Sequence, residues 1–327
     1  RAKSFSYYLP SKKKNNAKSN NKNYHVGLIS LPSFYRNFSV KNHSSQDYVS
    51  SATDIAKEIK RLEESSLDAI ILDLRFNGGG SLDEAVQVSG LFIGKGPMVQ
   101  VESRRSGIFS RGTSMDPLNS KENAVFLEKP LFILVSKQSA SASEILAGAI
   151  QDYKRGLIIG DKHTFGKGSV QNLVDKSQEG LGGLKVTIMG FYRPTGKTTQ
   201  KYGVSSDIVL PSLLDQLEIG EKYYDYALDL NNQTFAKSFY QDRFVTGDLQ
   251  STYCIDKLNS LKSLSKERIQ SNKDFIKIQK EIEDYKKELK NKYQISLKEN
   301  SKKKETKKEE EKTSVDSDNS DIEKPDL

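Results

Sequence analysis

Apolar and polar positions follow two periods along the chain, and these periods predict strands and helices in turn. Short apolar runs predict strands at Tyr24–Leu31, Ala69–Leu74, Leu131–Val135 and Leu157–Gly160. Between these runs, helical spacing of apolar residues or a helix-start motif predicts helices at Ser50–Glu64, Leu82–Ile93 and Ser141–Tyr153. This alternation predicts an α/β fold with a mostly parallel sheet and crossover helices.

The pattern changes in the later part of the chain. Leu184–Met189 alternates apolar and polar residues, which predicts a half-exposed strand. Residues 255–297 are charged with helical spacing and predict a helical hairpin or one long helix, without any internal repeat. We therefore divide the chain into a flexible basic lead-in (1–23), a core (24–215), a helical region (216–298) and a disordered charged tail (299–327).

Composition removes several classes of function. The net charge is +8, but residues 1–46 hold nine basic side chains and no acidic one, so the excess lies in a polar lead-in. A nucleic-acid binder spreads positive charge over a folded face, so we expect no nucleic acid as partner. One cysteine, Cys254, excludes a disulfide scaffold, and three scattered histidines make a structural zinc site implausible. We expect no metal, no cofactor and no membrane-spanning segment, which would need about 20 apolar residues.

The first motif that could carry chemistry is ASASE, Ala140–Glu144, which follows a predicted strand and opens a predicted helix. A serine in this motif, such as Ser141, lies at the positive end of the helix dipole, among backbone N–H groups without helical partners. That position suits a nucleophile and an oxyanion. A serine at a helix start is more often an N-cap, so this motif alone leaves both interpretations open.

The second motif is TFGKGSVQ, Thr164–Gln171, in which glycines flank Lys167. A lysine held by a tight glycine turn and shielded from water has a lowered pKa and is able to accept a proton near neutral pH. The alternatives are a solvated turn lysine or a phosphate-binding loop. The P-loop pattern requires Ser or Thr after the lysine, and Gly168 stands there instead.

The third motif is LDLRFNGGGS, Leu72–Ser81, where consecutive glycines follow a strand. Such a turn exposes backbone N–H donors for an oxyanion or a phosphate, or is merely a tight connection. A Ser-His-Asp site would need a histidine, and His163 is the one near these motifs. A Ser-Lys site needs none, and the residues themselves leave this choice open.

The three motifs together resemble the C-terminal processing proteases, in particular the tail-specific protease branch. The resemblance runs from about residue 24 to 245 and is carried by GLISLPSFY, IILDLRFNGGGSLDEAVQVSGLFI, SASASEILAGAIQDYKRGLIIG, TFGKGSVQ and LKVTIMGFYRPTGKTTQKYGVSSDIVLP. It implies a core of the crotonase/Clp-protease type and a serine endopeptidase that cleaves proteins with exposed, apolar, free C-termini through an acyl-enzyme. It further implies a periplasmic or exported location and leaves room for an adaptor or activator protein.

Carried onto this chain, the resemblance implies that Ser141 is the nucleophile, Lys167 the general base and Gln171 the residue that orients the lysine. Backbone N–H groups of Ala142 and of the glycine turn, Gly79 above all, would form the oxyanion hole. An uncharged glutamine suits a neutral lysine, because a carboxylate in its place would raise the lysine pKa.

Two acidic residues have weaker claims to a supporting role. Glu144 lies one helical turn after Ser141, and Asp152 follows in QDYKR. The alternative for Asp152 is an ion pair with Arg155 on the helix surface.

Two other functions stay open beside this one. The resembling proteases carry a PDZ domain before the first strand, and residues 1–23 are too short for one. The domain is therefore cut from this chain, or substrate selection works differently. One rival is accordingly a catalytically silent, peptide-binding scaffold, and the other is a Ser-His hydrolase that uses His163.

Overall fold

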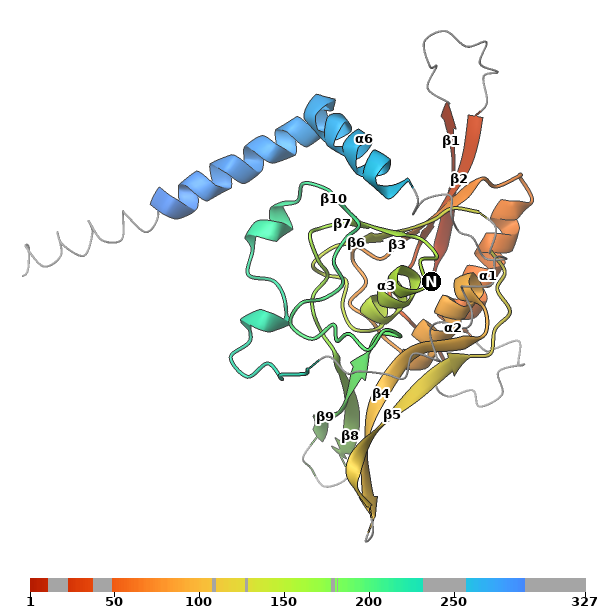
Figure 1. Ribbon diagram of the computed structural model, residues 1–327, viewed down its shortest axis with the longest axis vertical. Helices are drawn as coiled ribbons and strands as arrows, with labels where there is room; N and C mark the ends of the chain where they lie inside the picture. Colours follow the sequence, from red (N-terminus) through yellow and green to blue (C-terminus); the bar gives the residue numbers. More distant parts are fainter. Residues whose placement is uncertain are drawn as a thin grey trace, which may run out of the picture.

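Two sheets and their covering helices form the computed structural model, which describes residues 1–10, 23–37, 49–107, 110–126, 129–177, 180, 182–231 and 257–291. The larger sheet has six strands in the order β1 (Lys3–Pro10), β2 (Asn23–Ser30), β3 (Ala69–Asp73), β6 (Leu131–Val135), β7 (Leu157–Gly160), β10 (Ile208–Val209). Every neighbouring pair is parallel except β1–β2. The predicted α/β core with a mostly parallel sheet is confirmed (Figure 1).

Three crossover helices pack on this sheet: α1 (Ser51–Glu63), α2 (Leu82–Ile93) and α3 (Ala142–Asp152). α1 begins where expected, because the Ser50 side chain caps it by accepting from the Thr53 N–H, and it buries Ile55 and Ile59 on one face. Apolar residues of all three helices join those of the sheet in one continuous core. The predicted helices are confirmed to within a residue or two at their ends.

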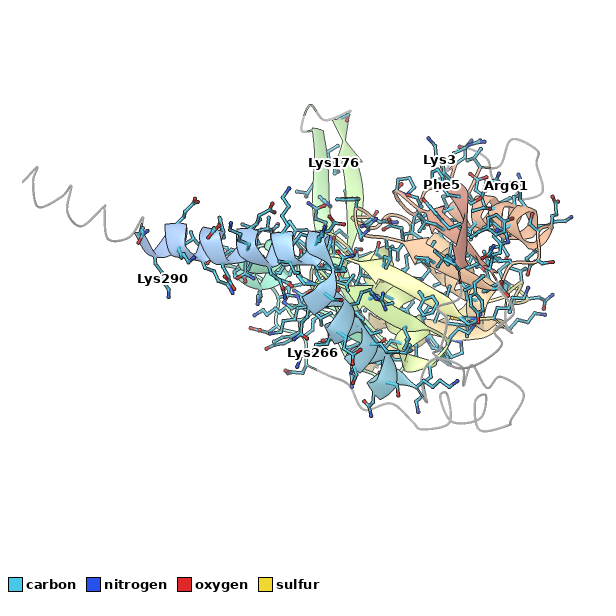
Figure 2. All side chains as sticks on the ribbon, turned by 90° about the horizontal axis from the view of Figure 1, so that it is seen from above. Lys3, Phe5, Arg61, Lys176, Lys266 and Lys290 are labelled. Carbon is cyan, nitrogen blue, oxygen red and sulfur yellow. The ribbon has the colours of Figure 1, made fainter. Side chains whose placement is uncertain are left out.

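On the opposite face, α6 (Leu258–Ser271) packs on the part of the sheet formed by β6, β7 and β10. Because side chains alternate along a strand, Ile133 of β6 belongs to the main core while Phe132 packs with Leu258 and Leu261 of α6. A second helix spans 273–291 after a break at Asn272. Figure 2 shows both helices beside the body, and none of the described helices is long and apolar enough to cross a bilayer.

The smaller sheet is antiparallel, with strands in the order β5 (Ser110–Ser120), β4 (Gly96–Gly107), β9 (Gly182–Tyr192), β8 (Ser169–Lys176). Of these strands the sequence predicted only part of β9. The strand β8 continues directly from the glycine-flanked Lys167 and forms one edge of the sheet. The β8–β9 hairpin stands out from the body, with Lys176 toward its outer end (Figure 2).

The prediction of a flexible lead-in at residues 1–23 is wrong for Lys3–Pro10, which forms β1 and pairs with β2 along its full length. Phe5, Tyr7 and Leu9 alternate with other residues at the period of a strand, a signal that the nearby lysine run obscured.

The C-terminal predictions have a mixed outcome. The predicted helical region, 216–298, contains two helices within 257–291. Its beginning is not α-helical, because η2 (Leu213–Gln216) and η3 (Glu221–Tyr223) are short 3-10 helices. Residues 232–256 and 292–298 of that region lie outside the described residues. The remaining lead-in residues 11–22 and the tail 299–327 lie outside the described residues.

Candidate active site

Ser141 occupies the sharp turn between β6 and α3, where it is the N-cap residue of the helix. Its backbone has φ 56° and ψ −112°, a conformation that L-residues avoid and that persists only when neighbours enforce it. The enforcement comes from preceding residues: the Ser139 hydroxyl donates to the Leu74 carbonyl at 2.8 Å, and the Ala140 N–H to the Asn77 carbonyl at 3.2 Å. The turn that holds Ser141 at the start of α3 is thus fixed by the hydrogen bonds of the two residues before it.

The glycine turn Gly78–Gly80 packs directly against Ser141. Gly79 has φ 110°, and a Cβ there would lie 2.9 Å from the Ala140 carbonyl oxygen and 3.0 Å from the Ser141 Cβ. Gly80 has φ 143°, and its Cβ would approach the Phe34 carbonyl oxygen to 2.3 Å. Only glycine fits both positions, so the turn is required for close contact with the serine loop.

Asn77 joins these pieces, and the sequence analysis missed it. Its buried side chain accepts from the Gly79 N–H at 2.9 Å and donates to the Leu31 carbonyl at 3.0 Å. Its backbone carbonyl accepts from the Ala140 N–H and from the Ser143 hydroxyl. A polar residue between a buried strand and a glycine run was the available signal.

Lys167 lies in the loop that enters β8, between two closely packed glycines. A Cβ on Gly166 would lie 2.8 Å from the Lys201 carbonyl carbon, and one on Gly168 would lie 2.8 Å from the Gln200 N. The Lys167 ammonium donates to Gln171 Oε1 at 2.8 Å, which is the pairing that the resemblance implies. Burial, followed by the nearby positive charge of Lys185, lowers the Lys167 pKa below its ordinary value.

Glu144 ties the serine loop to the lysine loop. Oε2 of this fully buried carboxylate accepts from the backbone N–H groups of Ser141 and Lys167, both at 2.8 Å. Oε1 accepts from the Thr164 hydroxyl and the Gly166 N–H, both at 2.6 Å. Burial raises the Glu144 pKa to about 7, and the four hydrogen bonds oppose that rise.

Asp152 lies at the far end of α3 and does not line the groove described below. Its carboxylate accepts from the Arg193 guanidinium and from the Thr195 hydroxyl, the latter at 2.7 Å. Arg155, the partner considered in the sequence analysis, donates to the backbone carbonyls of Phe92 and Phe126.

One groove of about 880 Å³ collects most of the predicted residues. Those that line it are Ser141, Ala142, Lys167 and Gln171, together with Gly78 and Gly80 of the glycine turn. Gly79, Glu144, Asp152 and His163 do not line it. Further lining residues were not predicted as site residues, and Arg36, Ser81, Asp83 and Lys185 are among them.

This arrangement suits acyl transfer. A serine at a helix N-terminus lies beside the N–H of Ala142, and a lysine with a lowered pKa opens into the same groove. Within the described ranges, no three His, Cys, Asp or Glu side chains gather as metal ligands would.

Comparison with known proteins agrees with this chemistry. The model of peptidase family S41 matches residues 25–210. The tail-specific protease of Haemophilus influenzae is 41% identical over 209 residues, which are 62% of this chain and 27% of that protein. The carboxy-terminal-processing protease of Bartonella bacilliformis is 36% identical over 182 residues, covering 54% and 39% of the two chains.

Among solved structures, the photosystem II D1 C-terminal processing protease is 28% identical, with a TM-score of 0.49, and the match covers 64% of this chain and 48% of that one. The chain spans well under half the length of the two curated relatives. The family model alone covers more than half of this chain, from the strand β2 to the end of β10. The chain therefore belongs to peptidase family S41.

Proposed function

We propose that this chain is a serine endopeptidase that processes proteins at their C-terminal tails, with Ser141 as nucleophile and Lys167 as general base. One observation carries the proposal: Ser141 and the Lys167–Gln171 pair line the same groove, and the Lys167 pKa is lowered by burial. A lysine that is neutral near physiological pH is able to accept the serine proton, whereas an ordinary ammonium is not.

In the acylation step, Ser141 Oγ forms a bond to the scissile carbonyl carbon while its proton passes to Lys167 Nζ. As the C–N bond breaks, Nζ gives that proton to the leaving amine and is neutral again. In the second step a water molecule attacks the acyl-enzyme carbonyl and gives its proton to Nζ, which passes it to the departing serine oxygen. Gln171 Oε1 holds the amine throughout.

The developing oxyanion needs backbone donors, and the Ala142 N–H at the start of α3 is one of them. The second comes from the glycine turn. Because the Gly79 N–H donates to Asn77 Oδ1, its use requires that this bond open, whereas Gly78 and Gly80 line the groove. Glu144 supports the site by holding both loops, and Asp152 supports it by holding Arg193 and Thr195.

The substrates in this proposal are proteins with exposed apolar C-terminal tails, delivered with or without an adaptor, outside the cytoplasm. The names of the relatives support the C-terminal processing, and the resemblance of the motifs supports the rest.

The test is cleavage of an unstructured protein with an apolar free C-terminus, followed by mass spectrometry. We expect wild type to cut and both Ser141→Ala and Lys167→Ala to lose about 10⁴-fold or more in kcat/KM, because residues of a catalytic unit fail together. Cleavage by Ser141→Ala at the wild-type rate would overturn the proposal. Peptide binding without cleavage by wild type would favour the silent scaffold instead, and loss of turnover in His163→Ala the Ser-His hydrolase.

The pH profile is a second test of the lysine base. Since only neutral Lys167 accepts the proton, kcat/KM is expected to rise about tenfold per pH unit below the Lys167 pKa and to level above it. The midpoint of this rise is expected below the ordinary lysine value of 10.5, because burial lowers this pKa. An acid optimum with activity lost above neutrality would contradict the role of Lys167.

A further inference from the structure

Four charged side chains line the groove, and three of them are already engaged. Arg36 pairs with Asp83 at 2.6 Å, and Lys167 donates to Gln171. The fourth is Lys185, for which the described part of the chain records no carboxylate within ion-pair distance. Apart from Lys167, the charged groups that line the groove therefore carry one uncompensated positive charge, that of Lys185.

The strand register places Lys185 beside the catalytic pair. β8 and β9 pair Gln171 with Thr187, and Lys185 lies two residues from Thr187 along β9. Because alternate side chains of a strand share a face, Lys185 lies on the face of Thr187. Gln171 Nε2 donates to Thr187 Oγ1 at 3.5 Å, so this is also the face of the residue that holds Lys167.

From this placement we propose that Lys185 forms a carboxylate-binding subsite of the groove, so that the chain prefers peptides with a carboxylate near the scissile bond. The proposal rests on the proposed function, because it concerns the same groove. A carboxylate reaches this position from two sources, an Asp or Glu side chain or the free C-terminus of the substrate.

A surface lysine is ordinarily worth little, but this one is coupled to the general base. The charged groups around Lys167 are Lys185 on β9, which lowers its pKa, and Glu221 in η3 and Glu144 on α3, which raise it. The paired Arg36 and Asp83 lie across the same groove. A bound carboxylate would neutralise Lys185 and so remove its lowering effect on the Lys167 pKa.

Peptides that differ in one group test the subsite. Glu, Gln or Lys is placed at each position flanking the cleaved bond, and the C-terminus is either free or amidated. At low salt we expect wild type to prefer the carboxylate peptide about fivefold in kcat/KM, Lys185→Ala to lose that preference, and Lys185→Glu to prefer the lysine peptide. Comparison of peptides with a free and an amidated C-terminus shows whether the preferred carboxylate is the C-terminus or a side chain.

Lys266→Ala is the matched control, because it removes an exposed lysine on α6, away from the groove (Figure 2). This variant is expected to keep the wild-type preference. Equal cleavage of the Glu and Gln peptides and of the free and amidated ones by wild type, or a wild-type preference in Lys185→Glu, would overturn the proposal.

The pH profiles provide a readout that a merely structural lysine would not move. The rising limb of the kcat/KM profile reports the Lys167 pKa in the free enzyme, and the rising limb of the kcat profile reports this pKa in the enzyme–substrate complex. With the carboxylate peptide, the kcat limb is expected at higher pH than the kcat/KM limb, whereas with the uncharged peptide the two coincide. Lys185→Ala is expected to move the kcat/KM limb to higher pH, since one repulsive charge is gone. Coincident limbs with both peptides would contradict the proposal.

Binding separates this proposal from the function on which it rests. Anisotropy of labelled peptides with Ser141→Ala, and with Ser141→Ala combined with Lys185→Glu, needs no turnover. We expect the first protein to bind the carboxylate peptide about fivefold more tightly than the uncharged one and the second to bind it less tightly. If that difference is present while wild type cleaves nothing, the subsite stands and the protease does not. If it is absent while wild type cleaves, the subsite is wrong.

Discussion

The groove has two walls, the serine wall (Ser141 and the start of α3) and the lysine wall (Lys167 and the β8–β9 hairpin), and they differ in how deeply their residues are buried. On the serine wall, Ser141 follows a buried strand, and Asn77 and Glu144 fix its loop with buried hydrogen bonds. On the lysine wall, Gln171 and Lys185 lie exposed on the β8–β9 hairpin, where the Gln171 side chain contacts Lys167 Nζ at 2.8 Å and Thr187 Oγ1 at 3.5 Å. One wall is fixed by the core and the other is open to solvent.

This difference separates two tasks. A nucleophile and its oxyanion donors must hold their geometry closely, which favours rigid elements and buried partners. A strand edge with free backbone groups is a place where an extended peptide is able to pair, so β8 suits substrate contact. Substitutions on the serine wall should therefore cost stability and activity together, and those on the lysine wall activity alone.

Glu144→Gln is expected to have the largest effect, because this residue joins the two walls. Both carboxylate oxygens accept two hydrogen bonds, so an amide nitrogen at either place leaves two buried donors unpaired. Each costs about 1–3 kcal/mol of unfolding free energy. Displacement of the Ser141 and Lys167 loops is expected to lower kcat/KM about 100-fold. Denaturant unfolding and peptide cleavage measure the two effects.

Glu84→Ala is the matched control, because it also leaves two hydrogen-bond donors without their acceptor. This residue is also buried and accepts from the Ser51 hydroxyl and the Ala52 N–H, both at 2.9 Å, but it does not line the groove. The variant should lose stability without a comparable loss of activity. An equal loss of activity would mean that Glu144 acts only through general stability.

The pH dependence of the unfolding free energy is a second test of the role of Glu144. Burial raises the Glu144 pKa to about 7 from an ordinary 4.5, so the folded state holds this proton more tightly than the unfolded state. The associated stability is present below about pH 4.5 and is lost as the pH rises through about 7. The difference in unfolding free energy between wild type and Glu144→Gln should change over that window, and a constant difference would contradict the assignment.

Gln171→Ala is expected to have a smaller effect, confined to activity. Loss of the 2.8 Å bond to Lys167 leaves the amine without its orienting acceptor, which corresponds to about 1 kcal/mol and to roughly a fivefold fall in kcat. Stability is expected to change little, because Gln171 is exposed. Val174→Ala, three residues further along β8 and outside the groove, is the control. A drop in stability as large as that of Glu144→Gln would remove the distinction between the walls.

The serine wall was also the more predictable one, for the same physical reason. Strands such as β6 and β7 are buried on both faces, so their residues form continuous apolar runs. Ser141 and Lys167 stand out because a helix start and flanking glycines mark them locally. β4, β5 and β8 carry many polar residues, and it is their pairing with neighbours that makes them strands.

Residues whose place depends on distant partners could not be predicted. Asn77 matters through Leu31 and Ala140, and Lys185 through a register that brings β9 beside β8. The position of Asn77 between a buried strand and a glycine run marks it as a candidate but does not reveal these partners, and Lys185 does not differ locally from an ordinary strand lysine. The roles of Ser141 and Lys167 remain predictions, which the cleavage assay tests.

Thr187→Val is expected to have the smallest effect and is the most discriminating test of the lysine wall. Valine keeps the shape but removes the hydroxyl that accepts from Gln171 Nε2 at 3.5 Å, so kcat is expected to fall about twofold. If Thr187 acts only by holding Gln171, the double variant Gln171→Ala/Thr187→Val should be no slower than Gln171→Ala alone. Additive losses in this double-mutant cycle would mean that Thr187 contacts the substrate itself, and the open wall would then be a recognition surface along β9 as well as β8.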